Sequence, residues 1–253
     1  MLSRSWAKHL YHDNRDPSVA TALPQGDTLT RPFVFINVAM TADGKIDTFE
    51  RKGAGISSKR DKERVDQLRA ESDAVLVGGK TLLEENPKLT VKSEALREDR
   101  VRRGLSPNPI KVGIASRVEL HPDSDFLKAG PARIVIFTTY QASKEQVDFL
   151  RGQGVEVFIH DSEYVDLSKA LETLYELGAR RIMVEGGGTL NFELIRLGLV
   201  DEISVYMAPM IFGGVNSPTL ADGIGLTQDE AIHLKIVDIE KEDGGGVFIK
   251  YKL

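Results

Sequence analysis

The sequence contains no cysteine, which excludes disulfide bonds, thiolate metal centres, iron–sulfur clusters and a cysteine nucleophile. It has only five histidines and no His-Glu-x-x-His motif, so we expect neither a zinc hydrolase nor another metal site. Basic residues are not in excess: 33 Lys and Arg stand against 38 Asp and Glu, and this net charge of −5 argues against nucleic acid as a partner. No apolar run reaches about 18 residues, so we expect no membrane span and a cytoplasmic location.

What is present is an ordinary globular composition, with 41% hydrophobic and 28% charged residues over 253 positions. Residues 1–32 differ from the rest, because Leu2, Trp6 and Leu10 recur every four residues. This spacing predicts a short amphipathic helix, docked on the body of the protein or on a partner, before a tether. No linker or repeat interrupts the remainder of the chain. We therefore expect an N-terminal extension over 1–32 and a single domain over 33–253.

Strand and helix patterns alternate through most of this domain. Apolar, β-branched runs typical of strands buried on both faces occupy residues 33–40, 73–79, 110–116, 132–139, 155–160 and 179–188. Helical patterns occur at 58–72, 80–86, 143–151, 165–178 and 189–198, whereas the charged stretch 92–103 predicts an exposed loop or a solvated helix. Such alternation predicts βαβ crossovers and a mostly parallel sheet.

The pattern changes near the C-terminus. Residues 200–214 and 233–253 have the composition of long strands, the second folded into a hairpin around Asp243, Gly244 and Gly245. These segments predict antiparallel strands added at one edge of the parallel sheet. The expected fold class is therefore α/β, a mixed sheet with a parallel core, antiparallel edge strands and flanking helices.

Ligands of open α/β sheets bind where strands end and lead into helices, and a run of three glycines marks one such end. These glycines, residues 186–188, lie between Glu185 and the pair Thr189-Leu190. Without side chains between strand and helix, backbone N–H groups at the helix N-terminus can bind an anion. A tight turn that needs a positive φ would require only one glycine, so we expect a phosphate or dinucleotide contact here.

Two further strand ends carry candidate ligands. The strand that ends near residue 79 leads into Thr81 and Glu85, which share one helix face and suit either a ligand or ordinary helix capping. The strand that ends near residue 115 leads into Ser116 and Arg117. A hydroxyl beside a guanidinium suits a phosphate monoester, although the same residues are common in surface turns.

Polar side chains also occur inside apolar segments. Asn37 interrupts one predicted strand and Glu185 closes another, and each is interpreted either as a structural hydrogen-bonding residue or as a catalytic one. Arg69, on a neighbouring helix, would supply a cation to the same site or form a salt bridge with Glu71 or Asp73. No Ser-His-Asp set, glycosidase carboxylate pair or metal spacing is present. Hydride transfer fits best, because the cofactor then carries the chemistry.

Five sequence blocks occur in one order and spacing: NVAMTADGKI (37–46), the run 69–91, IASR (114–117), VEGGGTLN (184–191) and the run 198–214. Together they resemble the reductase of riboflavin biosynthesis, whose fold is similar to dihydrofolate reductase. The resemblance implies a homodimeric enzyme that uses NADPH, with NADH less favoured. It implies conversion of a phosphoribosylamino-pyrimidine into its ribitylamino form, by reduction of the sugar C1′ and opening of the ribose ring.

The resemblance also implies roles for individual residues. The matching cofactor positions are Ala39, Thr81, Glu85, Ser116, Gly186, Gly187, Gly188, Thr189 and Leu190, with Arg117 beside Ser116 at the 2′-phosphate. The matching substrate positions are Asn37, Arg69, Leu89, Lys92 and Glu185, of which Asn37 and Glu185 are the candidate catalytic residues. Arg69 and Lys92 would meet the 5′-phosphate, Leu89 would contribute backbone, and Asn37 and Glu185 would meet the ribose hydroxyls.

Departures from the family pattern narrow the substrate. The chain lacks the zinc deaminase that bacterial bifunctional members carry. Asn37 stands where those members tend to have Lys, Glu85 where Asp is usual, and Lys92 where some have Arg. These residues favour the 2,5-diamino-pyrimidinone over the deaminated uracil. Other readings remain open: a dihydrofolate-reductase-like enzyme with another substrate, such as a pterin, and a non-catalytic nucleotide or flavin sensor.

Overall fold

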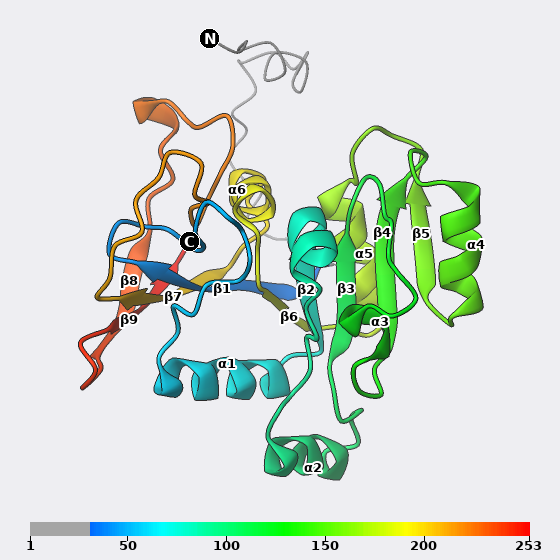
Figure 1. The fold of residues 1–253 in the computed structure, drawn as a ribbon, viewed down its shortest axis with the longest axis horizontal. Coiled ribbons are helices and arrows are strands. Elements are labelled where there is room, and N and C mark those ends of the chain that lie inside the picture. The colour runs from blue at the N-terminus through cyan, green and yellow to red at the C-terminus, as the bar shows by residue number, and fades with distance from the viewer. Residues whose placement is uncertain (1–30) are drawn as a thin grey trace, which may run out of the picture.

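The computed structural model describes residues 31–253, so the helix predicted from Leu2, Trp6 and Leu10 lies outside the described residues. Its centre is a nine-stranded sheet in the order β5-β4-β3-β2-β6-β1-β7-β9-β8 (Figure 1). The strands are β1 (Phe33–Thr41), β2 (Ala74–Gly78), β3 (Ile110–Ile114), β4 (Ile134–Thr139), β5 (Glu156–His160), β6 (Arg181–Val184), β7 (Glu202–Ala208), β8 (Lys235–Lys241) and β9 (Val247–Lys252).

The expected parallel core with an antiparallel edge is confirmed. Strands β5 to β7 in the sheet order pair in parallel, and the hairpin of β8 and β9 pairs antiparallel on β7. One detail of the prediction for 200–214 is wrong. This segment forms β7, which is parallel to β1, and the strand ends at Ala208 because Pro209 has no N–H to donate to a ladder.

Several helices begin at residues whose side chains cap them. They are α1 (Lys59–Glu71), the π-helical turn η2 (Thr81–Glu85), α2 (Glu94–Arg102), α3 (Asp125–Lys128), α4 (Lys144–Gly152), α5 (Leu167–Glu176), α6 (Gly188–Arg196) and the 3₁₀ turn η3 (Gln228–Glu230). Ser58 caps α1 by accepting a hydrogen bond from Asp61 N, and Ser143 caps α4 in the same way. The charged stretch 92–103 is the solvated helix α2, whereas α3 was not predicted.

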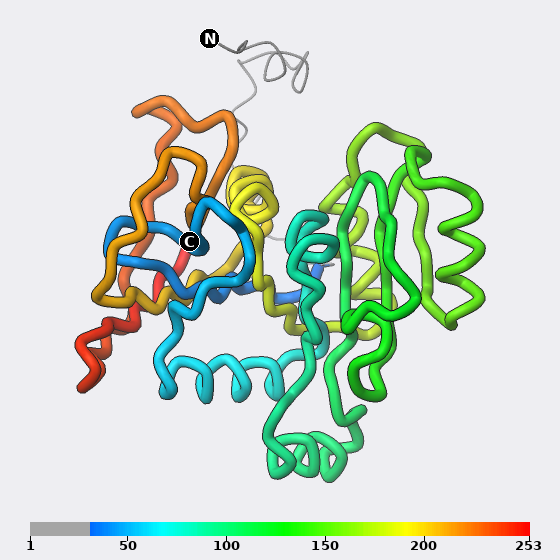
Figure 2. The backbone as a smooth tube through the Cα atoms, in the orientation of Figure 1, coloured from blue at the N-terminus to red at the C-terminus, as the bar shows by residue number. Residues whose placement is uncertain are grey.

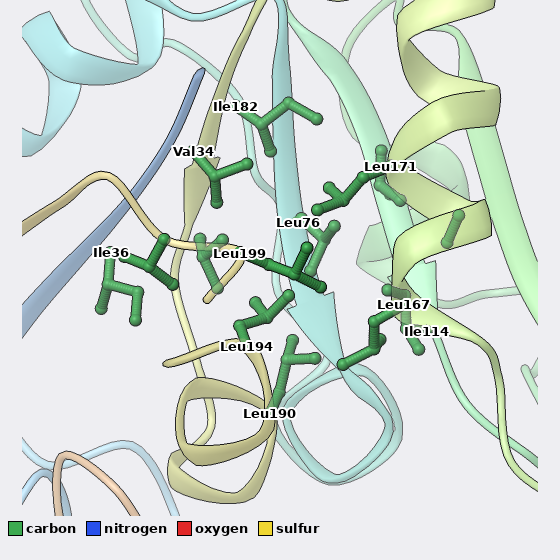
Figure 3. Packing of buried hydrophobic residues seen from close by; sticks show 14 of the residues in the cluster. Val34, Ile36, Leu76, Ile114, Leu167, Leu171, Ile182, Leu190, Leu194 and Leu199 are labelled. Atoms are coloured by element: carbon green, nitrogen blue, oxygen red, sulfur yellow. The ribbon is translucent and has the colours of Figure 1, made fainter. Parts of the chain in front are cut away.

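Two hydrophobic clusters cover the two faces of the sheet, because alternate strand residues point to opposite sides. On one face, Val34 and Ile36 of β1 lie with Leu171 of α5 and Leu194 of α6 (Figure 3). On the other face, Phe35 joins a cluster with buried side chains from η2, α3 and α4, against which α1 packs. The sheet is thus buried on both sides over most of its parallel part, and its strand ends are held at fixed positions.

Two buried cationic side chains donate hydrogen bonds to backbone carbonyls at helix C-termini. Arg100 of α2 is 2% exposed and donates to two carbonyls at the end of α1. Lys111 of β3 has no exposed surface and donates through Nζ to Phe126 O (2.5 Å) and Ala129 O (2.9 Å) at the end of α3. Burial lowers the pKa of Lys111 to about 8, and Asp125 opposes this shift only in part.

Candidate active-site cleft

A cleft of about 1680 Å³ lies at the carboxyl ends of β1, β2, β3 and β6. Two loops from distant parts of the sequence, 42–57 and 209–224, run side by side along one wall (Figure 2). They are joined by backbone hydrogen bonds from Ala42 N to Met210 O (2.9 Å) and from Ile46 N to Pro218 O (3.0 Å). Within 31–253 no helix is long and apolar enough to cross a membrane, and no group of His, Asp and Glu could hold a metal ion.

The three glycines between β6 and α6 have different structural requirements. Gly186 has φ +101°, a conformation that side-chain residues rarely adopt, and its peptide bond to Gly187 is cis. At Gly188 a Cβ atom would overlap Thr219 O and lie 2.7 Å from Asp222 Oδ2. At Gly187 a Cβ atom would meet only Thr81 Oγ1, at 3.4 Å. Chain geometry therefore explains Gly186 and Gly188, but not Gly187.

Gly187 borders the cleft at the start of α6. It is the N-cap residue, and no side chain caps this helix end. The first N–H groups of an α-helix have no partner within the helix, and the helix dipole favours negative charge there. Gly188, Thr189 and Leu190 also line the cleft, so this helix end provides backbone donors for an anion, as the glycine pattern predicts.

Thr81 of η2 lies beside this helix end, and Glu85 follows it one turn later. Thr81 Oγ1 donates to Glu85 Oε1 (3.1 Å), and both residues line the cleft. Burial raises the pKa of the Glu85 carboxyl. The Thr81 bond lowers it, whereas the carboxylates of Asp47 and Glu84 raise it further. The cleft thus contains an acidic group that protonates more readily than an exposed glutamate.

Asn37 and Ala39 lie on β1 with the same orientation, two residues apart, and both line the cleft. Asn37 is 7% exposed, and among the described residues its side-chain amide has no hydrogen-bond partner. Because Asn37 lines the cleft, this amide is available to hydrogen-bond a ligand there.

Glu185 lines the cleft and forms an ion pair with Arg69 of α1. Arg69 Nε donates to Glu185 Oε1 (2.6 Å) and Nη2 to Oε2 (2.7 Å), while Nη1 donates to Thr90 O (3.0 Å). Burial alone would lower the pKa of the Arg69 guanidinium, but Glu185 and Asp66 together outweigh burial and raise it. The sequence suggested Glu71 or Asp73 as the salt-bridge partner of Arg69, and this is wrong: Glu71 accepts from Gln67, and Asp73 from two backbone N–H groups.

Four of the residues predicted for the site do not line the cleft: Gly186, Arg69, Leu89 and Lys92. Leu89 is 1% exposed and has φ +48°, and Lys92 is exposed with its backbone N–H bonded to Asp66 Oδ1 (2.6 Å). The Arg69 bond to Thr90 O connects this segment to Glu185. Residues 89–92 thus approach the site through Arg69 and not by lining the cleft.

Ser116 and Arg117 line the cleft beyond η2, next to the start of α5. The structure thus brings together all the predicted cofactor positions except Gly186 along one cleft. Sequence reasoning missed several lining residues, among them Asp47, Arg51, Tyr164, Ser168 and Asp222. Ser168 lies in the first turn of α5, the helix that follows β5, so the rule that ligands bind where a strand leads into a helix could have found it. The other four lie on loops without any periodic pattern.

Comparison with known proteins decides the family. The family model described as the RibD C-terminal domain matches residues 32–248. This chain belongs to that family. A protein of Archaeoglobus fulgidus named 2,5-diamino-6-ribosylamino-4(3H)-pyrimidinone 5′-phosphate reductase is 46% identical over 193 residues, which cover 76% of this chain and 87% of that protein. A protein of the same name from Methanothermobacter thermautotrophicus is 40% identical over 81% of this chain and 91% of its own length.

A solved structure agrees with this assignment to the RibD C-terminal domain family at the level of the fold. A pyrimidine reductase-like protein from Corynebacterium diphtheriae superposes with a TM-score of 0.73 at 21% identity, covering 87% of this chain and 91% of that one. The resemblance found in the sequence is therefore confirmed, and the relatives are named as reductases of riboflavin biosynthesis. The roles of individual site residues stay predictions.

Proposed function

We propose that this protein uses NADPH to reduce 2,5-diamino-6-(5-phosphoribosylamino)pyrimidin-4(3H)-one to its ribitylamino form. The observation that carries the proposal is one cleft that contains two kinds of binding group side by side. It offers a helix N-terminus with a glycine that neither φ nor packing requires, and beside them Glu185 held by Arg69. Relatives at 46% and 40% identity carry the name of this reductase.

The residues present fit a nicotinamide dinucleotide. Gly187 leaves open a cradle that a Cβ would fill, and the N–H groups of Gly188, Thr189 and Leu190 suit a pyrophosphate. Ser116 and Arg117, further along the cleft, suit the 2′-phosphate that distinguishes NADPH from NADH. NADPH, when bound, supplies the hydride for the reduction.

On the substrate side, the protein orients the sugar. The Glu185 carboxylate, fixed by two bonds from Arg69, is placed to accept hydrogen bonds from ribose hydroxyls, and the unpartnered amide of Asn37 can supply a donor. Three of the five N–H groups of Arg69 are engaged, which leaves two for the 5′-phosphate, with Lys92 as the second cation. Holding the sugar in this way would fix C1′ within the cleft for the reduction.

We also propose that the protein is a homodimer, and strand β8 supports this. Its residues are exposed on both faces of the strand, including Ile236 (51%), Val237 (47%) and Ile239 (58%). An edge strand with exposed apolar side chains is a site for pairing with another chain. Analytical ultracentrifugation of the wild type and of Ile239→Lys tests this, and a monomeric wild type overturns it. The cytoplasmic location expected from the sequence stays a prediction.

The function is tested by anaerobic incubation of the purified protein with NADPH and each of the two candidate pyrimidines, with absorbance followed at 340 nm. We expect faster oxidation with the diamino-pyrimidinone than with the deaminated uracil, and slow oxidation with either dephosphorylated analogue. Faster reaction with the uracil would reverse the substrate assignment. A pterin as the better substrate would favour a dihydrofolate-reductase-like activity, and NADPH binding without turnover would favour a sensor.

A further inference from the structure

The turn that carries Ser116 and Arg117 is held by two side-chain hydrogen bonds from β4. The hydroxyls of Thr138 and Thr139 both donate to Ser116 O, at 3.1 and 2.9 Å. Both threonines are fully buried. A carbonyl that accepts two hydroxyls from a rigid strand has little freedom, so the backbone of this turn is fixed at the cleft wall.

The side chain of Arg117 is held as well, although the residue is exposed. Its Nε donates to Gln141 Oε1 (3.2 Å). Within the described part of the chain, this is the one hydrogen bond that the Arg117 side chain makes. A free arginine side chain loses rotamer entropy when it binds a ligand. A contact that restrains it beforehand reduces that loss.

Gln141 is itself fixed from two sides. Its Nε2 donates to Glu163 O (2.6 Å) in the loop after β5, and its backbone N donates to Thr139 Oγ1 (3.2 Å). The bond to a carbonyl identifies Nε2 as the donor and leaves Oε1 for Arg117. Gln141 thus connects the loops that follow β3, β4 and β5 into one bonded unit around Arg117.

The chemistry of this partner is informative. Nε is the engaged atom, so the N–H groups of both terminal nitrogens remain available for a phosphate. A carboxylate at the same place would orient Arg117 equally well, but it would neutralise the charge that an anion requires. The neutral amide orients the guanidinium and leaves its charge unpaired.

We infer that Gln141 is a positioning residue that holds Arg117 for the 2′-phosphate and so sets the preference for NADPH over NADH. This inference rests on the proposed function, because it assumes that the cleft binds a dinucleotide. Gln141 acts through Arg117 and makes no contact with the cofactor. Its effect is therefore confined to ligands that carry the 2′-phosphate.

The test compares Gln141→Ala, Gln141→Glu and Arg117→Ala with the wild type, and uses Gln67→Ala as the control, since the Gln67 amide pairs with Glu71 on α1. Adenosine 2′,5′-bisphosphate and AMP serve as probes in calorimetry, so binding is read without turnover. We expect Gln141→Ala to weaken the bisphosphate roughly 3- to 10-fold, the range of one hydrogen bond, and Gln141→Glu to weaken it further. AMP affinity should not change in any variant.

Steady-state kinetics give the second measurement. In both Gln141 variants the KM for NADPH should rise while kcat and the KM for NADH stay at wild-type values. In an Arg117→Ala background, Gln141→Ala should add no further loss. A wild type that binds neither probe overturns the dinucleotide proposal. A wild type that prefers the bisphosphate, with Gln141 variants that bind it equally well or that lose AMP in parallel, overturns only the role of Gln141.

Discussion

Replacing each of the last two glycines of the β6–α6 turn by alanine separates the two reasons for a glycine there. Gly187 has φ −73° and ψ −176°, which alanine adopts readily, and its Cβ would lie 3.4 Å from Thr81 Oγ1. We expect Gly187→Ala to change the free energy of unfolding by less than about 1 kcal/mol. Gly188→Ala places its Cβ against Thr219 O and 2.7 Å from Asp222 Oδ2.

The loop opposite Gly188 cannot move away without cost. Asp222 N donates to Gly188 O (3.0 Å), and Asn191 Nδ2 donates to Leu220 O (2.8 Å). Overpacking of this kind costs about 1–3 kcal/mol, so we expect Gly188→Ala to lower the free energy of unfolding by that amount. Urea unfolding followed by circular dichroism measures both variants, with Gly152→Ala as the control because a Cβ there meets nothing within 4 Å.

For cofactor binding we expect the opposite order: Gly187→Ala should weaken it more than Gly188→Ala does. The Gly187 methyl group would occupy the space in front of the α6 N–H groups, and loss of one or two hydrogen bonds to a phosphate corresponds to about 3 kcal/mol, or roughly 100-fold in the Kd for NADPH. Fluorescence titration with NADPH measures this. A Gly187→Ala protein that binds NADPH like the wild type would refute the contact, and one that unfolds would show that the turn itself requires this glycine.

Two further predictions follow from buried charges. Arg69→Lys loses the two parallel hydrogen bonds to Glu185, so we expect the KM for the phosphorylated substrate to rise. With a dephosphorylated analogue the KM should rise by a smaller factor. An equal rise in KM with both substrates would show that Arg69 does not bind the phosphate. The pKa of Lys111 is about 8 in the native state and 10.5 when unfolded, so between these pH values the unfolded chain binds more protons than the native protein. The free energy of unfolding should therefore rise with pH over this range, by at most roughly 3 kcal/mol. Urea unfolding at pH 7 to 10.5 should show this rise in the wild type and not in Lys111→Met, and a rise that persists in the variant would assign it to another group.

Local features of the fold could be predicted from the sequence because their causes are local. Ser58 and Ser143 cap helices through bonds to residues three positions away, and Gly186 needs its own positive φ. The alternation of Val34, Phe35 and Ile36 between two cores follows from strand geometry.

Other features depend on contacts between distant residues, and no sequence pattern carries them. Arg69 and Glu185 are 116 positions apart, so the nearby Glu71 and Asp73 were the only partners a local reading could offer. The parallel pairing of β7 with β1 likewise depends on which sheet edge the strand reaches. For the site, the strand-end rule found the glycine turn and Ser116, whereas the restraint of Arg117 by Gln141 required the relative positions of three loops.

The position of β1 between β6 and β7 has a consequence for the order in which the chain can assemble during synthesis. Strands β2 to β5 adjoin one another in sequence order. The two neighbours of β1 in the sheet, β6 and β7, are synthesised only about 140 residues or more after β1. Pairing between such distant segments forms slowly, because the intervening chain must first be ordered. Asn37 lies on β1 and Glu185 directly follows β6, so the part of the cleft that these two residues line is completed late. A nascent chain that stops before Glu202 would have β2 to β5 in place and expose the apolar edge of β1 to chaperones or to other chains.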